Sequence, residues 1–341
     1  MPGADKGRQP QGFAGPSSPR ASPDKAGLPA YPDGDWSRQE SRAWYWTKRL
    51  GPWAGYGALA GALLLLGLAR GWEGALRPGL GFYAGLVFGT HLLQELAIFA
   101  PVRSVRATPE SVGLAFEPFA VQARDGETVR GWFVPGIPGR PTVLFCHGNS
   151  SNISSRAHLA AVAVWRDLGL SCAVFDYRGF GASSGFPSER GTYLDVEAVW
   201  DYLVRQRSIP PREIAVWGRS LGGGPASHLA LRQPRCRILV LESTFISMHR
   251  LVFRLVPLLP APLALRVRYP VRERVRRLRC PLLVMHSPQD ETVPFSHGLA
   301  IIRAAPGPKH FTELRGGHNF GFLESADRYR DAVRRHLIGE S

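Results

Sequence analysis

Cysteine is scarce in this chain of 341 residues, which contains only four. They are Cys146, Cys172, Cys236 and Cys280, each in or next to an apolar run, and no two form a close pair. The absence of a C-x-x-C pair or a Cys/His cluster argues against a metal site, and we expect neither a metal nor a cofactor. Unpaired, buried thiols favour a reducing compartment.

Acidic residues are also few, with 27 against 42 lysines and arginines, so the formal net charge is +15. Such a charge favours an anionic partner, either nucleic acid or an acidic membrane face. The sequence has no zinc-finger, RNA-recognition or helix-turn-helix signature. We therefore expect an anionic lipid surface and no nucleic acid.

The N-terminal region divides into a tail and a membrane anchor. Residues 1–41 are rich in proline, glycine and serine without periodicity, which predicts a disordered tail. Within the anchor, 42–101, the run 51–69 has no charged residue and is long enough to cross a bilayer, so we predict a transmembrane helix. A second run, 79–100, has one formal charge, Glu95, and predicts a second span.

Two arrangements of the anchor remain open. Glycines spaced four apart in both runs favour a hairpin of two spans. The alternative is one span followed by an interfacial helix. Basic residues are denser before the first run and after the second than between them, which places both ends of a hairpin inside and makes the following domain cytoplasmic. A single span with the same tail orientation would place that domain outside.

Residues 102–341 alternate short apolar runs with helical stretches, which predicts a mostly parallel sheet covered by helices on both faces. The first two of eight strands form a hairpin around Asp125-Gly126. A short cap segment, 243–279, interrupts the alternation. The expected strands are 116–123, 129–134, 142–146, 171–175, 213–217, 237–241, 281–286 and 309–314. The expected helices are 154–168, 189–206, 221–232, 294–305 and 319–338.

The motif Gly218-x-Ser220-x-Gly222 lies between the expected strand 213–217 and the expected helix 221–232. In this context it predicts a nucleophile elbow, a sharp turn that presents the serine at a helix N-terminus. A turn with an ordinary exposed serine is the alternative. The strand before the motif and the helix after it favour the elbow.

An activated serine needs a base and an acid that orients the base. Asp290 is the first carboxylate after the strand 281–286 and is the candidate acid, with Glu242 as the fallback. His318 follows two glycines between the last strand and the last helix and is the candidate base. The order serine, acid, histidine is that of α/β hydrolases. The backbone N–H groups of Leu221 and Asn149 are the candidate oxyanion donors.

These motifs together resemble the α/β-hydrolase superfamily, and more narrowly its membrane-anchored branch of α/β-hydrolase-domain serine hydrolases. The resemblance covers about residues 95–338 and implies an α/β-hydrolase fold and hydrolysis of esters or thioesters, often of long-chain acyl groups. Where the family usually has His-Gly, this chain has His286-Ser287. The motifs are His147-Gly148-Asn149, Asp176-Tyr177-Arg178-Gly179-Phe180-Gly181-x-Ser183-x-Gly185, Pro187-Ser188-Glu189, Gly218-Arg219-Ser220-Leu221-Gly222-Gly223, Asp290-Glu291-x-Val293-Pro294 and Gly317-His318.

The cap segment is too short for a full lid domain, but it carries an apolar helix followed by an arginine run. It could dock on a membrane and admit acyl chains, or form an ordinary core helix beside a solvated basic face. A membrane-anchored hydrolase of acyl lipids or other acylated substrates is therefore the leading hypothesis. A serine peptidase with the same three residues is the alternative. A non-catalytic membrane scaffold is a remote one, because all three residues are present.

Overall fold

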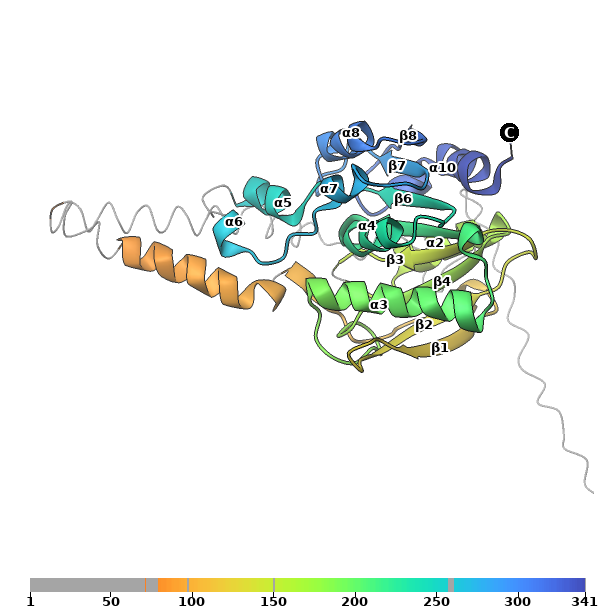
Figure 1. Cartoon of the computed structure of the whole chain (residues 1–341), viewed down its shortest axis with the longest axis horizontal. Coiled ribbons are helices and arrows are strands. Elements are labelled where there is room, and N and C mark those ends of the chain that lie inside the picture. The colour runs from red at the N-terminus through yellow and green to blue at the C-terminus, as the bar shows by residue number, and fades with distance from the viewer. Residues whose placement is uncertain (1–70, 72–78, 97, 150, 257–260, 341) are drawn as a thin grey trace, which may run out of the picture.

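The computed structural model describes residues 71, 79–96, 98–149, 151–256 and 261–340. The predicted tail, 1–41, and the predicted first span, 51–69, lie outside the described residues. The described residues form an eight-stranded sheet with helices packed around it (Figure 1). Its strands are β1 (Glu117–Gln122), β2 (Thr128–Val134), β3 (Thr142–Cys146), β4 (Ser171–Asp176), β5 (Ile214–Arg219), β6 (Ile238–Glu242), β7 (Leu282–His286) and β8 (Lys309–Glu313).

The strand order is β1-β2-β4-β3-β5-β6-β7-β8. β2 pairs antiparallel with both β1 and β4, and all other neighbours are parallel. The predicted mostly parallel sheet with an initial hairpin is therefore confirmed. The register sets Arg219 beside Glu242 and His286 beside Glu313. Because parallel strands end at the same edge, the loops that follow β3, β5, β6, β7 and β8 gather there.

Side chains of the central strands alternate between two apolar cores, one on each face of the sheet. Val216 in β5 packs into one core with helices α3, α4 and α8, and its neighbour Trp217 packs into the other with α2 and α10. These helices are α2 (Arg156–Asp167), α3 (Glu189–Asp201), α4 (Gly223–Arg232), α8 (Phe295–Ala304), α9 (Gly321–Glu324) and α10 (Ala326–Val333). Short turns of other helix types are η1 (Pro109–Val112), η2 (Tyr202–Gln206), η3 (Pro211–Glu213), η4 (Ser220–Gly222) and η5 (Arg334–Ile338).

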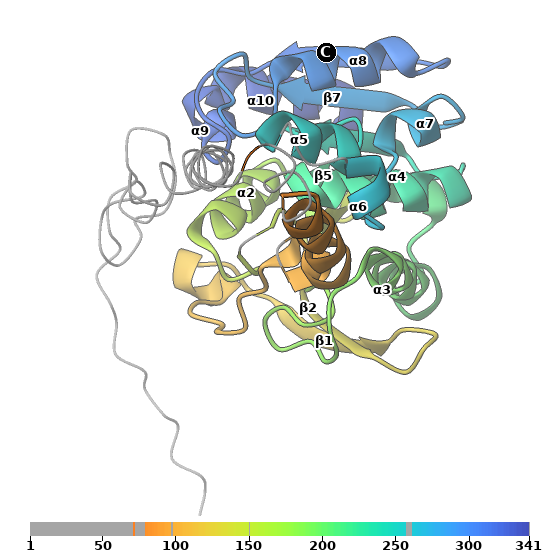
Figure 2. The ribbon, with the colours of Figure 1, turned by 90° about the vertical axis from the view of Figure 1, so that its left-hand side faces the viewer.

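The predicted cap segment, 243–279, forms three short helices: α5 (Met248–Leu255), α6 (Ala261–Ala264) and α7 (Val271–Val275). Helix α5 buries Met248 and Leu251 but exposes Phe253 and Leu255. Figure 1 shows α5 and α6 towards one end of the molecule, and Figure 2, which looks onto that end, shows them next to the helix that precedes the sheet.

That preceding helix, residues 79–96, is called the N-terminal helix here, and it extends away from the sheet (Figure 1). Its large apolar side chains are exposed: Leu80, Phe82, Leu86, Phe88, Leu92, Leu93 and Leu96. None of the helices in the described part of the chain has both the length and the apolar character that crossing a membrane requires.

The C-terminal end of the predicted second span, 79–100, packs on the domain that contains the sheet. Gln94 is buried, and its side-chain oxygen accepts hydrogen bonds from the backbone N–H groups of Arg266 and Val267, at 2.6 and 2.9 Å. Phe99 is fully buried, with its ring centroid 6.3 Å from that of Tyr269. A buried amide satisfied by protein backbone shows that Gln94, like Phe99, packs on the folded domain, before the predicted start of that domain at residue 102.

The four cysteines are all free and buried. Burial raises the thiol pKa of Cys172 well above its ordinary value, because the thiolate would lose its hydration. The predicted interpretation of the cysteines as small buried hydrophobes agrees with this placement.

Candidate active site

Ser220 occupies a sharp turn that leaves no room for a side chain at Gly222. Its φ of 51° is left-handed, which is uncommon for a residue other than glycine and marks a strained position between β5 and α4. A Cβ at Gly222 would lie 1.9 Å from the carbonyl oxygen of Cys146, so any side chain there would collide with the backbone of β3. The predicted strand, sharp turn and helix are therefore all present, and Ser220 lies beside the N-terminus of α4.

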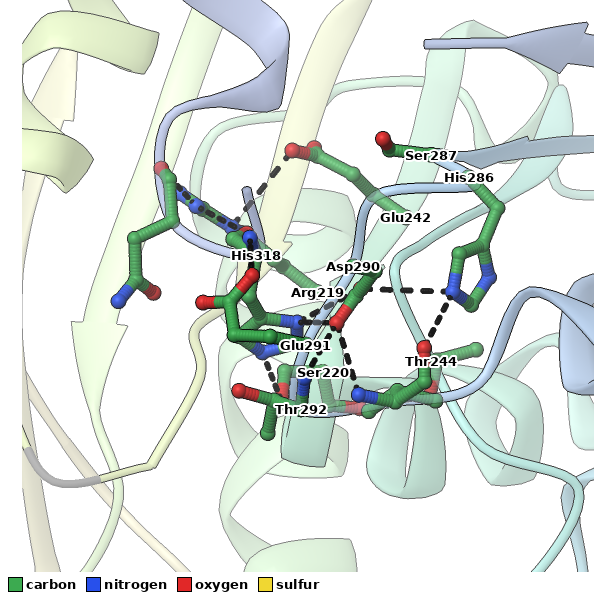
Figure 3. Close-up of polar contacts among 12 residues, drawn as sticks. Arg219, Ser220, Glu242, Thr244, His286, Ser287, Asp290, Glu291, Thr292 and His318 are labelled. Carbon is green, nitrogen blue, oxygen red and sulfur yellow. Dashed lines mark hydrogen bonds and ion pairs between the residues drawn. The ribbon is translucent and has the colours of Figure 1, made fainter. Parts of the chain in front are cut away.

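His318 reaches Ser220 from the loop after β8. The distance from His318 Nε2 to Ser220 Oγ is 3.0 Å, and His318 Nδ1 lies 2.8 and 3.0 Å from the two carboxylate oxygens of Asp290 (Figure 3). Because Nδ1 faces two acceptors, it carries the proton, and Nε2 is left to accept the Ser220 hydroxyl. The structure thus brings together the three residues predicted from distant parts of the sequence.

Asp290 is held by more than His318. Its Oδ1 accepts the backbone N–H groups of Thr292 and Val293, at 2.9 and 2.7 Å. Its Oδ2 lies 3.3 Å from His286 Nε2. Burial alone would raise the pKa of this carboxyl, but hydrogen bonds from His286 and His318 outweigh it and hold the pKa well below the ordinary value. Asp290 is therefore ionised and can orient the His318 ring.

His286 was not among the predicted site residues. Its ring is fully buried at the end of β7, and Nε2 lies 3.0 Å from the carbonyl oxygen of Val293, so Nε2 is the protonated nitrogen. Its Nδ1 is buried and has no hydrogen-bond partner among the residues that the structure describes. The sequence signal for this contact was a histidine four residues before the candidate acid, at the C-terminal end of a strand.

The loop after β3 lies against the nucleophile, as expected for a loop that carries Asn149. A Cβ built on Gly148 would lie 3.5 Å from Ser220 Cβ. The Asn149 side chain donates a hydrogen bond to the carbonyl oxygen of Ile98, which ties this loop to the chain that leaves the N-terminal helix. Leu221 follows Ser220 in the first turn before α4. Leu221 therefore adjoins Ser220, and Asn149 follows the glycine that lies against it.

A buried histidine and carboxylate lie behind this loop. His147 Nε2 is 3.5 Å from Asp176 Oδ1, and the same oxygen accepts the Ile153 backbone N–H at 2.9 Å. Burial raises the Asp176 pKa to about 7 and lowers the His147 pKa to about 4, because desolvation disfavours both charged forms. Asp176 ends β4 and Glu189 begins α3, where Glu189 accepts the Tyr269 backbone N–H.

Glu242, the fallback acid, faces another partner. Its Oε2 accepts the Trp217 indole N–H at 2.9 Å, and its Oε1 lies 3.6 Å from Arg219 Nε. Among the described residues, no group of three or more His, Cys, Asp or Glu side chains is placed to hold a metal ion. Ser220 Oγ faces the His318 imidazole, which the ionised Asp290 carboxylate orients, and this arrangement is suited to acyl transfer.

Comparisons with known proteins identify the family of the fold. A family model described as the alpha/beta hydrolase fold matches residues 141–262. The chain is 35% identical over 257 residues to the uncharacterized protein Rv2307c of Mycobacterium tuberculosis, which covers 74% of this chain and 90% of that protein. It is 32% identical over 243 residues to the alpha/beta hydrolase domain-containing protein WAV2 of Arabidopsis thaliana, covering 64% and 78%.

Among solved structures, the esterase Pf2001 of Pyrococcus furiosus has a similar fold, with a TM-score of 0.59 and 17% identity over 70% of this chain and 98% of that one. The fold, the family model and the relatives lead to one conclusion. The chain belongs to the α/β-hydrolase family.

Proposed function

We propose that this protein is a serine hydrolase that cleaves carboxylic esters or thioesters through an acyl-enzyme. The observation that carries the proposal is the continuous line of hydrogen bonds from Ser220 Oγ to His318 Nε2 and from His318 Nδ1 to Asp290. This line supplies a nucleophile, a base within reach of its proton, and an ionised group that orients the base.

In the first half of the proposed reaction, Ser220 Oγ attacks the acyl carbonyl while His318 Nε2 takes the hydroxyl proton. His318 then gives this proton to the leaving alcohol or thiol, and the acyl group stays on Ser220. In the second half, His318 takes a proton from water, the resulting hydroxide attacks the acyl-enzyme, and the proton returns to Ser220 Oγ as the acid leaves. Asp290 stays ionised throughout and stabilises the imidazolium.

The negative charge that develops on the acyl oxygen needs donors close to Ser220. We assign this role to the backbone N–H groups of Leu221 and Asn149, next to the N-terminus of α4, whose dipole favours an anion. A preorganised donor of this kind contributes about 10²- to 10³-fold in rate.

We further propose that the substrate is an acyl lipid or an acylated molecule at a membrane. Support comes from the exposed apolar side chains of the N-terminal helix and from Phe253 and Leu255 on α5, next to the exposed Arg250 and Arg254. Apolar side chains flanked by arginine suit the surface of an anionic bilayer. In this proposal the part of residues 42–101 that precedes Gln94 anchors the protein, and two spans would leave the catalytic domain in the cytoplasm.

The catalytic proposal is tested with the Ser220→Ala variant. Hydrolysis of p-nitrophenyl acetate and labelling by a fluorophosphonate probe should both be lost, with the thermal midpoint unchanged within about 2 °C. Retained turnover in this variant would refute the assignment. A panel of acyl esters, acyl thioesters and peptide amides then separates an esterase or thioesterase from a peptidase, since the same three residues can cleave amides.

The membrane proposal is tested by cosedimentation of the full chain with vesicles of neutral lipid and with vesicles that contain anionic lipid. Binding to both kinds is expected, and stronger binding to the anionic vesicles. Replacing Arg250 and Arg254 by glutamate should remove the preference for anionic lipid but leave binding to neutral vesicles. Equal binding of the unmodified chain to both kinds of vesicle would contradict the proposed charge recognition.

A further inference from the structure

Arg219 is a buried cation directly before the proposed nucleophile. Its side chain is only 4% exposed at the end of β5, and the Glu242 side chain beside it on β6 is 4% exposed as well. Arg219 Nε lies 3.6 Å from Glu242 Oε1, and the guanidinium carbon is 5.2 Å from the centre of the Phe322 ring. A buried guanidinium is retained where its charge and hydrogen bonds are both satisfied.

The guanidinium also binds the loop that carries the proposed base. Arg219 Nη2 donates to the carbonyl oxygen of His318 at 3.1 Å, and to the carbonyl oxygen of Asn319. Figure 3 shows the Arg219 side chain running from the nucleophile strand to this loop, with Glu242 on its other side. One side chain thus contacts two consecutive carbonyls, 99 and 100 residues away along the sequence.

This contact joins the loop of the base to the strand of the nucleophile, whereas two other contacts of the loop come from the segment after β7: Glu291 accepts the His318 backbone N–H at 3.0 Å, and the Gly316 carbonyl accepts the Ser287 hydroxyl at 2.6 Å. Gly316, with a φ of 89°, and Gly317 come directly before His318. Glycine loses more conformational freedom on ordering than any other residue, so the loop needs contacts that hold it. Arg219 is covalently next to Ser220, so its hydrogen bonds fix the position of the base relative to the nucleophile's own strand.

We infer that Arg219, itself oriented by Glu242, is a positioning residue that keeps His318 Nε2 within hydrogen-bond distance of Ser220 Oγ. The inference rests on the proposed hydrolase function. Arg219 does not reach the reacting atoms and acts only through the His318 loop. A displacement of a catalytic group by about 1 Å can cost about 10²-fold in rate.

A purely structural ion pair is the competing explanation, and it predicts different kinetics. If the ion pair is purely structural, removing Arg219 should have the same effect whether or not His318 is present. A positioning residue loses its effect once the base is removed, because effects of residues that act as a unit are not additive. Arg178 offers a matched control, since it is a buried arginine bound to Asp195 and Asp125 away from the site.

The experiment measures kcat and KM for p-nitrophenyl acetate and thermal midpoints in the full chain. Arg219→Met should lower kcat by about 10²-fold with KM changed less than about twofold. Arg219→Lys, which keeps a cation beside Glu242 and can reach one carbonyl, should recover part of that loss. Arg178→Met should lower the thermal midpoint while leaving kcat within about twofold.

The decisive comparison uses a His318→Ala background, where binding and the oxyanion donors leave residual catalysis of an activated ester. There Arg219→Met should change the residual rate by less than about twofold. An equal loss with and without His318, or a kcat of Arg219→Met close to that of the unmodified chain, overturns the inference. If Arg219→Met does not fold, Arg219→Lys carries the same comparison. Unchanged hydrolysis in Ser220→Ala would instead overturn the proposed function itself.

Discussion

Replacing Asp290 by asparagine should disable the base through its tautomer while leaving the site packed. Oδ1 of Asp290 accepts two backbone N–H groups, from Thr292 and Val293, so the asparagine oxygen will take that position. Its NH₂ group then replaces Oδ2, which lies 2.8 Å from His318 Nδ1 and 3.3 Å from His286 Nε2. Two N–H groups cannot donate to each other, and the asparagine oxygen, 3.0 Å from Nδ1, already accepts two backbone N–H groups, so we expect the His318 proton to move to Nε2.

A proton on Nε2 removes the acceptor for the Ser220 hydroxyl. A base held in the wrong tautomer lowers kcat by about 10⁴-fold in serine hydrolases, which is about 5.5 kcal/mol of transition-state free energy. We expect a loss of this size in kcat for p-nitrophenyl acetate. Asp125→Asn is the matched control, because its pKa is also held below the ordinary value, by Arg178, outside the site. A kcat of Asp290→Asn above about a tenth of the unmodified value would refute this reasoning.

The same variant should also change how stability depends on pH. The folded pKa of Asp290 is below its ordinary value of 3.8, so the ionised carboxylate stabilises the fold above that pH. This stabilisation is lost as the pH falls through the folded value. The unmodified chain should therefore melt above Asp290→Asn at pH 6, and the difference should shrink on acidification below pH 4.

Three further predictions follow from buried contacts. Gly222→Ala places its Cβ 1.9 Å from the Cys146 carbonyl oxygen and should destabilise the fold by at least about 2 kcal/mol in urea unfolding, whereas Gly307→Ala, which meets no atom within 4 Å, should be neutral. The pKa of Asp176 is raised to about 7, so ionising this carboxyl destabilises the fold as the pH rises from about 4 to 7. The thermal midpoint of Asp176→Asn should therefore increase relative to that of the unmodified chain over this range. A constant difference between the two midpoints would contradict the assignment. His286→Leu removes a donor to Asp290 and the hydrogen bond to the Val293 carbonyl. We expect kcat to fall about tenfold and the free energy of unfolding to fall by about 1–3 kcal/mol. The loss of kcat should be smaller in His286→Gln.

The strands were the most predictable part of the fold. Their ends agree with the sequence prediction to within two residues, because each buried strand is a short apolar run bounded by glycine, proline or polar residues. The expected helix 319–338 is broken into α9, α10 and η5, since the period of apolar residues does not reveal where a helix is interrupted. The position of β4 between β2 and β3 also depends on tertiary packing that the order of the runs does not specify.

Ser220, Asp290 and His318 could be proposed from their order and from the strand end that each follows. Arg219 and His286 were not proposed, because they lie in strands where alternation predicts only burial, and their partners are fixed by the tertiary fold. The arginine run of the cap was similarly ambiguous. Arg274, for example, donates to the Gly224 carbonyl at 2.9 Å and covers the Tyr193 ring, so part of this run packs against α3 and α4 and not on an open basic face.

The hydrogen bond from the Asn149 side chain to the Ile98 carbonyl has a practical consequence for trimming the protein. Asn152 binds the Val102 and Ser104 carbonyls in the same way, so one short stretch of chain supports the loop beside Ser220. A water-soluble fragment for crystallisation or screening should therefore begin before Gln94, which also binds the cap. A fragment that begins at residue 102 would lack the Ile98 and Gln94 contacts, and would understate the activity of the whole molecule.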